Sequence, residues 1–285
     1  MLTCEELLRR ACEQLESDTP RLDAELLLTR VTGLNRTSFR AWPERTLTDE
    51  QITAFETLLA RRVIGEPMAH ILGEQGFWTL TLSVNDSTLI PRPDTECLVE
   101  AILDLNLPGE ASILDLGTGT GAIALALASE KPDWRILAAD NSADAVELAK
   151  ENAARLNLPV DVFHSDWFAG LPARTFDLIV SNPPYVEADD EHLSRGDVRF
   201  EPASALVSGA DGLDDIRHLI ASSPDWLAEG GWLVLEHGYN QGAAVRDIFT
   251  RGGWDHIRTG QDYGGNDRYT LACRPHDGSG DRDAQ

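Results

Sequence analysis

From about residue 110 onward the chain alternates between short apolar runs and longer stretches with helical spacing, and this alternation limits its fold more than any other feature. Short apolar runs separated by helices predict a parallel, doubly wound α/β sheet with helices on both faces. The last two runs would complete the sheet, with one antiparallel strand near its edge. The expected strands are residues 113–116, 135–139, 160–164, 176–180, 232–236, 256–261 and 268–273, and the expected helices are residues 122–129, 142–156, 213–227 and 241–250.

The N-terminal part of the chain follows a different pattern. Amphipathic helices are expected at residues 2–15, 20–31 and 48–63. They predict a small helical domain at residues 1–72, which has no evident catalytic residues and would recognise or position a partner. Residues 73–90 have a period nearer two, which predicts a β-hairpin linker. The larger domain would span residues 91–275, and the Gly- and Asp-rich residues 276–285 would form a flexible tail.

The chain is strongly acidic, with 48 acidic and 24 basic residues and a formal net charge of −24. A long nucleic-acid footprint requires clustered Lys and Arg, so we expect no direct nucleic-acid binding. A surface suited to a saline cytoplasm would explain the charge, and a genomic preference for Arg is the alternative. No run of about 18 apolar residues and no apolar leader is present, so we expect a cytoplasmic protein without a membrane span.

The cysteines do not indicate a metal site. Cys4, Cys12, Cys97 and Cys273 are scattered, and no Cys-x-x-Cys pair is present. Cys273 and His276 have a suggestive spacing but no second pair of ligands. We therefore expect four reduced thiols and no bound metal.

A glycine-rich stretch follows the first expected strand of the larger domain, and it predicts a nucleotide site. Glycine lets the backbone approach a ligand closely and adopt positive φ. The spacing of Gly117, Gly119 and Ala122 also satisfies the dinucleotide pattern, so an NAD-dependent enzyme is an alternative. Asp140, at the end of the second strand, could accept hydrogen bonds from ribose hydroxyls of NAD or of S-adenosylmethionine. The stretch runs Asp115-Leu116-Gly117-Thr118-Gly119-Thr120-Gly121.

Two features separate these alternatives. Asp115 places a carboxylate where the amino group of a methionine moiety could lie, whereas the dinucleotide pattern usually has an apolar residue there. The fourth strand ends in Asn182-Pro183-Pro184-Tyr185, at the edge where open sheets bind ligands. This stiff turn suits a planar, weakly nucleophilic nitrogen, because it offers a carboxamide oxygen, a free carbonyl and an aromatic face. The alternative is a turn that only ends the strand.

Other residues gave weaker indications. Asp166 and Trp167 follow the third strand and could flank an adenine, with Trp167 otherwise an ordinary core aromatic. Arg92 lies between two prolines, in what is either a functional segment or a stiff linker. Glu236 and His237 end the fifth strand, and we expect a structural role for them.

The central motifs resemble those of class I S-adenosylmethionine-dependent methyltransferases that act on a nitrogen conjugated to a π system. Asn-Pro-Pro-Tyr is shared with adenine-N6 and guanine-N2 methyltransferases, so it does not fix the substrate. Throughout residues 1–275 the chain is similar to the peptide chain release factor N5-glutamine methyltransferases, the PrmC/HemK family. This longer resemblance is carried by residues 76–78 (GFW), 90–96 (IPRPDTE), 199–206 (RFEPASAL), 211–213 (DGL) and 264–268 (GGNDR).

The resemblance implies a Rossmann-like methyltransferase fold, S-adenosylmethionine as cofactor, and class I release factors as the protein substrate. The acceptor would be the glutamine of their Gly-Gly-Gln loop, with Arg92 and Glu201 near the substrate. The implied catalytic residues are Asn182, Pro183, Pro184 and Tyr185. The implied cofactor-binding residues are Asp115, Gly117, Thr118, Gly119, Thr120, Gly121, Asp140, Asp166, Trp167 and Asn182.

In the implied mechanism, the Asn182 side-chain oxygen and the Pro183 carbonyl accept the two amide hydrogens of the glutamine, and Tyr185 packs on the amide plane. No general base is required, because the proton becomes strongly acidic once the nitrogen is alkylated. Two other functions stay open from the residues: a nucleic-acid N-methyltransferase, which the acidic charge opposes, and a non-catalytic binding module, which the intact motifs disfavour.

Overall fold

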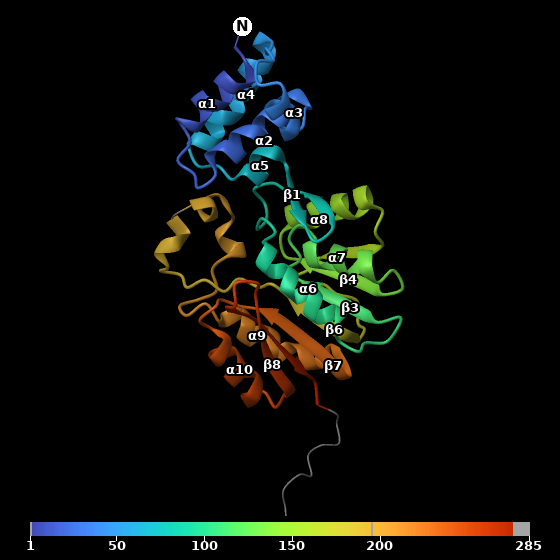
Figure 1. Ribbon diagram of the computed structural model, residues 1–285. Helices are drawn as coiled ribbons and strands as arrows, with labels where there is room; N and C mark the ends of the chain where they lie inside the picture. The colour runs from blue at the N-terminus through green and yellow to red at the C-terminus, as the bar shows by residue number, and fades with distance from the viewer. Residues whose placement is uncertain (1, 195, 276–285) are drawn as a thin grey trace, which may run out of the picture. The chain divides into compact units, whose positions relative to one another are not determined.

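The computed structural model describes residues 2–194 and 196–275, and the chain divides into two compact units (Figure 1). One unit contains Met1–Glu74 and Ser194–Phe200, and the other contains Gln75–Leu193 and Glu201–Gln285. The expected flexible tail at residues 276–285, including His276, lies outside the described residues.

The smaller unit is built from helices around an apolar core. Its helices are α1 (Cys4–Cys12), α2 (Pro20–Thr32), α3 (Arg36–Ala41), α4 (Asp49–Val63) and α5 (Met68–Leu72). The Thr3 and Thr48 side chains begin α1 and α4 with capping boxes, which satisfy backbone groups that a helix start leaves free. Phe39 and Phe55 are fully buried in the core. Helices α3 and α5 were not predicted, because helices of six and five residues are too short to show a periodicity.

A short 3-10 turn from later in the chain (Gly196–Phe200) belongs to this smaller unit. Asp197 lies 3.6 Å from the guanidinium of Arg62, which also pairs with Asp23 at 2.8 Å. The Arg199 guanidinium donates to the backbone carbonyl of Ile64. Polar contacts to α4 and the residue after it therefore attach this turn to the helices.

The larger unit contains a seven-stranded sheet in the order β5-β4-β3-β6-β7-β9-β8. Neighbouring strands from β5 to β7 pair in parallel, whereas β9 is antiparallel to both β7 and β8. This confirms the predicted doubly wound sheet with one antiparallel strand, which lies one position inside the edge strand β8. The strands are β3 (Ser112–Leu116), β4 (Arg135–Asp140), β5 (Val160–His164), β6 (Phe176–Ser181), β7 (Leu227–Glu236), β8 (Asp255–Gln261) and β9 (Asp267–Cys273).

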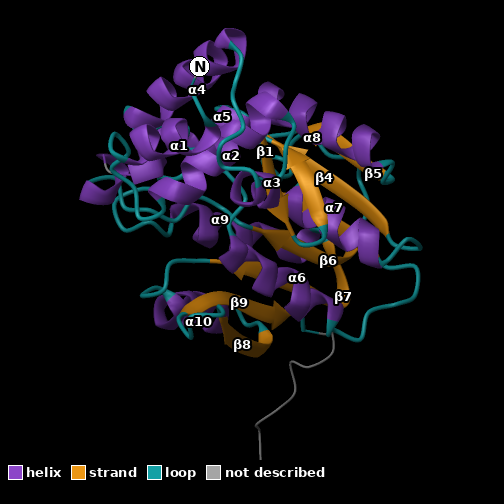
Figure 2. Cartoon of the chain, turned by 45° about the horizontal axis from the view of Figure 1, so that its top comes forward, coloured by secondary structure: helices purple, strands orange, loops and turns teal. Residues whose placement is uncertain are grey.

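Helices cover both faces of this sheet, which separates two apolar clusters (Figure 2). Successive strand residues point to opposite faces, so that Ile113 belongs to one cluster and Leu114 to the other. Helices α6 (Glu96–Leu103), α7 (Ala122–Glu130) and α8 (Ala143–Leu156) pack on the side of Ile113. Helices α9 (Asp214–Ser222) and α10 (Gly242–Arg251) pack on the side of Leu114.

The structure corrects the expected boundary between α9 and β7. The helix predicted at residues 213–227 ends at Ser222, and a 3-10 turn (Ser223–Asp225) that contains Pro224 follows it. The strand predicted at residues 232–236 begins earlier, at Leu227, and its pairing with β6 is shifted between Phe176 and Leu178. Glycines at 230 and 231 made this irregular part of the strand look like a loop.

The predicted hairpin is present as strands β1 (Glu74–Phe77) and β2 (Leu80–Ser83). Phe77 and Leu82 are buried in the same apolar cluster as α6 and α7. Most of the hairpin is thus part of the larger unit, and not only a connection.

Two further observations concern the whole described chain. Its four cysteines are free, and three of them are buried. In residues 2–194 and 196–275 no helix is long and apolar enough to cross a membrane.

Candidate active site

The order of the strands creates a crevice between β3 and β6. The chain runs from β3 outward to β4 and β5, and then returns to the other side of β3 to form β6. In open α/β sheets such a reversal leaves a ligand site outside the carboxyl ends of the two strands. A pocket lies there, and the glycine stretch after β3 and the Asn182 turn after β6 both line it.

The glycine stretch has a backbone shape that favours glycine. Gly117, Gly119 and Gly121 have φ values of +66°, +55° and +85°, and Gly117 is exposed in the pocket wall. A Cβ atom added to Gly117 would lie 3.8 Å from the Trp167 ring. The absence of a side chain there leaves room for a ligand between the loop and the indole.

Asp115 is the buried support of this loop. Its Oδ2 accepts hydrogen bonds from Thr118 Oγ1 at 2.6 Å and from the backbone N–H of Ala124 at 3.2 Å. Its Oδ1 is buried and has no hydrogen-bond partner among the described residues. Burial raises the pKa of Asp115 to about 7, and its two hydrogen bonds oppose that rise. Asp115 is not among the residues that line the pocket, although the loop that it supports does line it. One of its oxygens is thus a buried acceptor that the described residues leave unpaired.

Asp140 ends β4 and lines the pocket. Its Oδ2 accepts from the backbone N–H of Gly119 and its Oδ1 from that of Ser142, both at 2.9 Å. A carboxylate has about four acceptor positions, so each oxygen can accept one more hydrogen bond. Asp140 is thus held rigidly while it remains able to bind hydroxyl groups.

The segment after β5 agrees only in part with the sequence-based hypothesis. Trp167 lines the pocket and has the positive φ of +47°. Asp166 is exposed and is not among the residues that line the pocket. Thr88, which the sequence analysis missed, does line it, and its Oγ1 is buried without a partner in the described part of the chain. Its isolated position in a loop gave no motif that could have revealed it.

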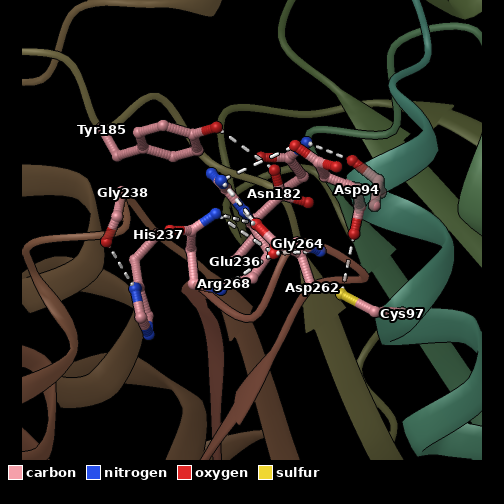
Figure 3. Close-up of polar contacts among 12 residues, drawn as sticks. Asp94, Cys97, Asn182, Tyr185, Glu236, His237, Gly238, Asp262, Gly264 and Arg268 are labelled. Atoms are coloured by element: carbon pink, nitrogen blue, oxygen red, sulfur yellow. Dashed lines mark hydrogen bonds and ion pairs between the residues drawn. The ribbon is translucent and has the colours of Figure 1, made fainter.

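The turn after β6 places its residues in different surroundings. Asn182 and Pro184 line the pocket, whereas Pro183 is buried and Tyr185 is not part of the pocket wall. Asn182 Nδ2 donates to Thr95 Oγ1 at 3.4 Å. The Tyr185 hydroxyl points toward Glu236 and donates to its Oε1 at 3.2 Å (Figure 3).

Glu236 belongs to a buried polar cluster behind this turn (Figure 3). Burial raises its pKa to about 7, while Thr95, Arg268 and Tyr185 oppose that rise. Burial also raises the pKa of Tyr185, with the charge of Glu236 adding to the effect. Arg268 pairs with Asp262 at 2.9 Å and lies 3.6 Å from Asp94. For Glu236 the sequence predicted only a structural role.

Arg92 and Glu201 form an ion pair at the pocket. Arg92 Nη2 lies 2.8 Å from Glu201 Oε2, and the other Glu201 oxygen accepts from the backbone N–H of Ile90 at 2.9 Å. The Glu201 side chain is fully buried, whereas that of Arg92 is one-third exposed and lines the pocket. The arginine is thus presented to the pocket and the glutamate anchors it.

A doubly wound sheet with a glycine loop after β3 and an Asn-Pro-Pro-Tyr turn after β6 defines a Rossmann-like methyltransferase, and comparison with known proteins agrees. A family model for the methyltransferase small domain matches residues 93–209, and one for the PrmC N-terminal domain matches residues 6–73. The chain belongs to the family of release factor glutamine methyltransferases. It is an enzyme of the methyltransferase class, and the dehydrogenase alternative is not supported.

Individual relatives document this membership. The release factor glutamine methyltransferase of Vibrio cholerae is 53% identical over 275 residues, which are 95% of this chain and 96% of that protein. The one of Pseudomonas aeruginosa is 55% identical over 257 residues, covering 90% of this chain and 93% of that protein. A solved methyltransferase from Pyrococcus furiosus shares the fold, with a TM-score of 0.54, 18% identity, and coverage of 77% of this chain and 99% of that chain.

Proposed function

We propose that this chain transfers a methyl group from S-adenosylmethionine to the side-chain amide nitrogen of the glutamine in the Gly-Gly-Gln loop of class I peptide chain release factors. The observation that carries the proposal is that Asn182 and the glycine loop line one pocket. Family membership supports the choice of a protein glutamine as acceptor. A translation factor as substrate would place the reaction in the cytoplasm, and the net charge of −24 opposes a nucleic-acid substrate.

The residues present suit S-adenosylmethionine. Asp140 would bind the ribose hydroxyls, and the ring of Trp167 would lie beside the adenine. The free Oδ1 of Asp115 and the unpartnered hydroxyl of Thr88 are buried polar atoms that a polar ligand would satisfy. When bound, S-adenosylmethionine supplies a methyl group attached to a positively charged sulfur. Asp166 is exposed, so we give it no larger role than a contact at the rim of the pocket.

The Asn182 turn would orient the acceptor. An amide nitrogen is a poor nucleophile, because its lone pair is delocalised into the carbonyl group. The Asn182 oxygen and the Pro183 carbonyl would accept its two protons, which aims the nitrogen and opposes that delocalisation. Orientation of reacting groups can contribute about 7–11 kcal/mol to lowering a barrier. Exclusion of water from the pocket would strengthen both hydrogen bonds.

The surroundings of Tyr185 change the role that we assign to it. The sequence-based hypothesis packed its ring on the acceptor amide. Its ring packs at the edge of the apolar cluster of α9 and α10, and its hydroxyl is bound to Glu236. We therefore assign Tyr185 to holding the turn, with Asn182, Pro183 and Pro184 closest to the acceptor.

Two further parts of the chain would serve the protein substrate. Arg92 faces the pocket and would contact the release factor, while Glu201 holds the arginine in place. We assign the smaller helical unit, which is built around an apolar core, to recognition of the release factor. Two of its large apolar side chains, Trp42 and Ile64, are exposed and could contribute to such a contact.

The function can be tested with labelled S-adenosylmethionine and three acceptors: a purified class I release factor, bulk RNA and bulk DNA. We expect label only in the release factor, on the glutamine of its Gly-Gly-Gln loop, as located by peptide mass spectrometry. Label in RNA or DNA would favour a nucleic-acid N-methyltransferase. Absence of label from all three would favour a non-catalytic binding module.

Substitution of the acceptor turn tests the site itself. Asn182→Ala should lower methyl transfer at least about 100-fold, because the variant loses the oxygen that orients the acceptor nitrogen. Asn240→Ala, at an exposed position outside the pocket, is the matched control and should keep wild-type turnover. Both variants should unfold at the wild-type temperature. An Asn182→Ala enzyme with near-normal turnover would contradict the assignment.

A further inference from the structure

The Asn182 carboxamide can be turned in two ways that differ little in shape, and only one of them suits the proposed function. If its oxygen faces the pocket, it can accept a proton of the acceptor amide. If its nitrogen faces the pocket, the NH2 group of Asn182 meets the NH2 group of the glutamine substrate, and these two hydrogen-bond donors repel each other. Among the described residues, no hydrogen bond is made to Asn182 Oδ1, and Nδ2 donates to Thr95 Oγ1 at 3.4 Å. What fixes this orientation is therefore of functional importance.

Thr95 is the residue that contacts the other end of this carboxamide. It ends the 3-10 turn Pro93–Thr95, immediately before α6, and it is only 4% exposed. A hydroxyl group has one proton and two lone pairs, so it can either donate to Asn182 or accept from it. If the hydroxyl proton of Thr95 is donated to another group, the Thr95 oxygen can only accept a hydrogen bond from Asn182.

Glu236 offers the acceptor for this proton. It ends β7, is 1% exposed, and its Oε2 is buried without a hydrogen-bond partner among the described residues. Thr95 is the side chain that most opposes the rise in the pKa of Glu236. The Tyr185 hydroxyl donates to the same carboxyl group, at 3.2 Å from Oε1. Figure 3 shows Tyr185, Asn182 and Glu236 gathered in one cluster, with Arg268 beside the carboxyl group. The Tyr185 hydroxyl and the neighbouring guanidinium favour the ionised carboxylate, which only accepts hydrogen bonds.

We propose that Glu236 and Thr95 are positioning residues for the reaction: Glu236 accepts a hydrogen bond from the Thr95 hydroxyl, Thr95 then presents a lone pair to Asn182 Nδ2, and the Asn182 oxygen is held toward the acceptor amide. Through the Tyr185 hydroxyl the same carboxyl group also holds the other end of the turn. This inference rests on the proposed function, since it explains how the acceptor-binding oxygen is oriented.

The test compares two substitutions of Thr95. Thr95→Val keeps the shape of the side chain but removes the hydroxyl, whereas Thr95→Ser keeps the hydroxyl. We expect kcat for release-factor methylation to fall about 10- to 100-fold in Thr95→Val, with KM for the release factor changed less than about threefold. Thr95→Ser should recover kcat to within about threefold of wild type.

Glu236→Gln provides an independent second variant of nearly the same size. A glutamine side chain has one acceptor oxygen in place of two and adds an N–H donor, so Thr95 can be left with its proton facing Asn182. We expect kcat to fall about tenfold, again with little change in KM. In the double variant Thr95→Val with Glu236→Gln, the loss should be smaller than the product of the two single losses, because both act in part through one hydrogen-bond chain.

Controls separate this role from a general loss of packing. Thr270→Val removes another fully buried hydroxyl, on β9, that bonds His237 and not Asn182. It should keep the wild-type kcat, and calorimetric affinity for S-adenosylmethionine should be unchanged in Thr95→Val. Thermal unfolding of each variant establishes that it is folded at the assay temperature.

The outcomes are distinguishable. An active wild-type enzyme with equal kcat in Thr95→Val and Thr95→Ser would overturn the inference and leave the proposed function standing. A loss in Thr95→Val matched by an equal loss in Thr270→Val would also overturn it, because the effect would then come from packing. A wild-type enzyme that does not methylate the release factor would overturn the proposed function and this inference together.

Discussion

Asp115 illustrates how a single residue can serve both the fold and the site. One of its oxygens holds the glycine loop, through Thr118 and the N–H of Ala124, while the other is buried without a partner in the described structure. A buried carboxylate oxygen without a partner is costly, and burial raises the pKa of Asp115 to about 7. The carboxyl group therefore keeps its proton up to about that pH. A cationic ligand group beside Oδ1 would favour the ionised form.

This predicts a pH dependence of cofactor binding. Below pH 7 Asp115 is protonated in the free protein, and binding of the positively charged methionine moiety must expel that proton. The affinity for S-adenosylmethionine should therefore fall as the pH is lowered from 7 to 5.5, by up to about tenfold per pH unit. Isothermal titration calorimetry in buffers of different ionisation enthalpy measures both the affinity and the released proton.

Asp115→Asn is the matched variant for this measurement. It keeps the size of the side chain and the possibility of a bond from Thr118, but it cannot titrate. We expect weaker binding at pH 7 and a flat profile down to pH 5.5. The same slope in Asp115→Asn as in the wild type would assign the pH dependence to another group.

At the scale of the elements, helix α8 is tied to two other segments by one buried side chain. Asn152 is fully buried. Its Oδ1 accepts from the backbone N–H of Ser83, and its Nδ2 donates to the carbonyls of Ser83 and Thr120. The hairpin and the glycine loop are therefore both fastened to α8 through the same carboxamide. In the amino-acid sequence alone, Asn152 is simply one asparagine in a helical stretch, and nothing indicates these contacts.

Removal of this carboxamide should destabilise the larger unit. Asn152→Ala leaves three backbone groups without partners, and we expect a loss of about 2–4 kcal/mol in the free energy of unfolding. Glu151→Ala, at the exposed neighbouring position, is the control and should change it by less than about 0.5 kcal/mol. Urea unfolding followed by circular dichroism gives both values. Equal effects of the two substitutions would refute this role for Asn152.

At the scale of the whole molecule, the dominant feature is the charge. Residues 1–72 carry 12 acidic and 9 basic side chains, so most of the net charge of −24 belongs to the rest of the chain. Mutual repulsion of like charges opposes a compact state, and salt screens it. The arginines do form ion pairs, such as the one between Arg62 and Asp23, but the 24 basic residues are only half as numerous as the 48 acidic ones.

The charge predicts a gain of stability with salt. The melting temperature should rise between 0.05 and 1 M NaCl by about 2–4 °C or more, which corresponds to roughly 1 kcal/mol for a protein of this size. Sucrose serves as an uncharged control for general solvent effects. A melting temperature that does not rise with NaCl would remove the explanation of the acidic surface as an adaptation to salt.

The amino-acid sequence by itself determined the class of fold, the positions of nearly all strands and the location of the candidate site. These followed from local patterns: apolar periodicity for the strands and helices, glycine spacing for the loop after β3, and two prolines for the turn after β6. Its errors were local as well. The short helices α3 and α5 have no measurable period, and the glycines in β7 concealed the beginning of that strand.

Only the tertiary structure decided which polar residues meet. Asn182 contacts Thr95, and Tyr185 contacts Glu236, although the members of each pair are far apart in the chain. They meet because the turn before α6 and the carboxyl ends of β6 and β7 lie together at the sheet. In the same way Asn152 reaches the hairpin and the glycine loop, and Glu201 reaches Arg92. Residue patterns report on neighbours along the chain, whereas burial and hydrogen bonding of side chains depend on segments that only packing brings together.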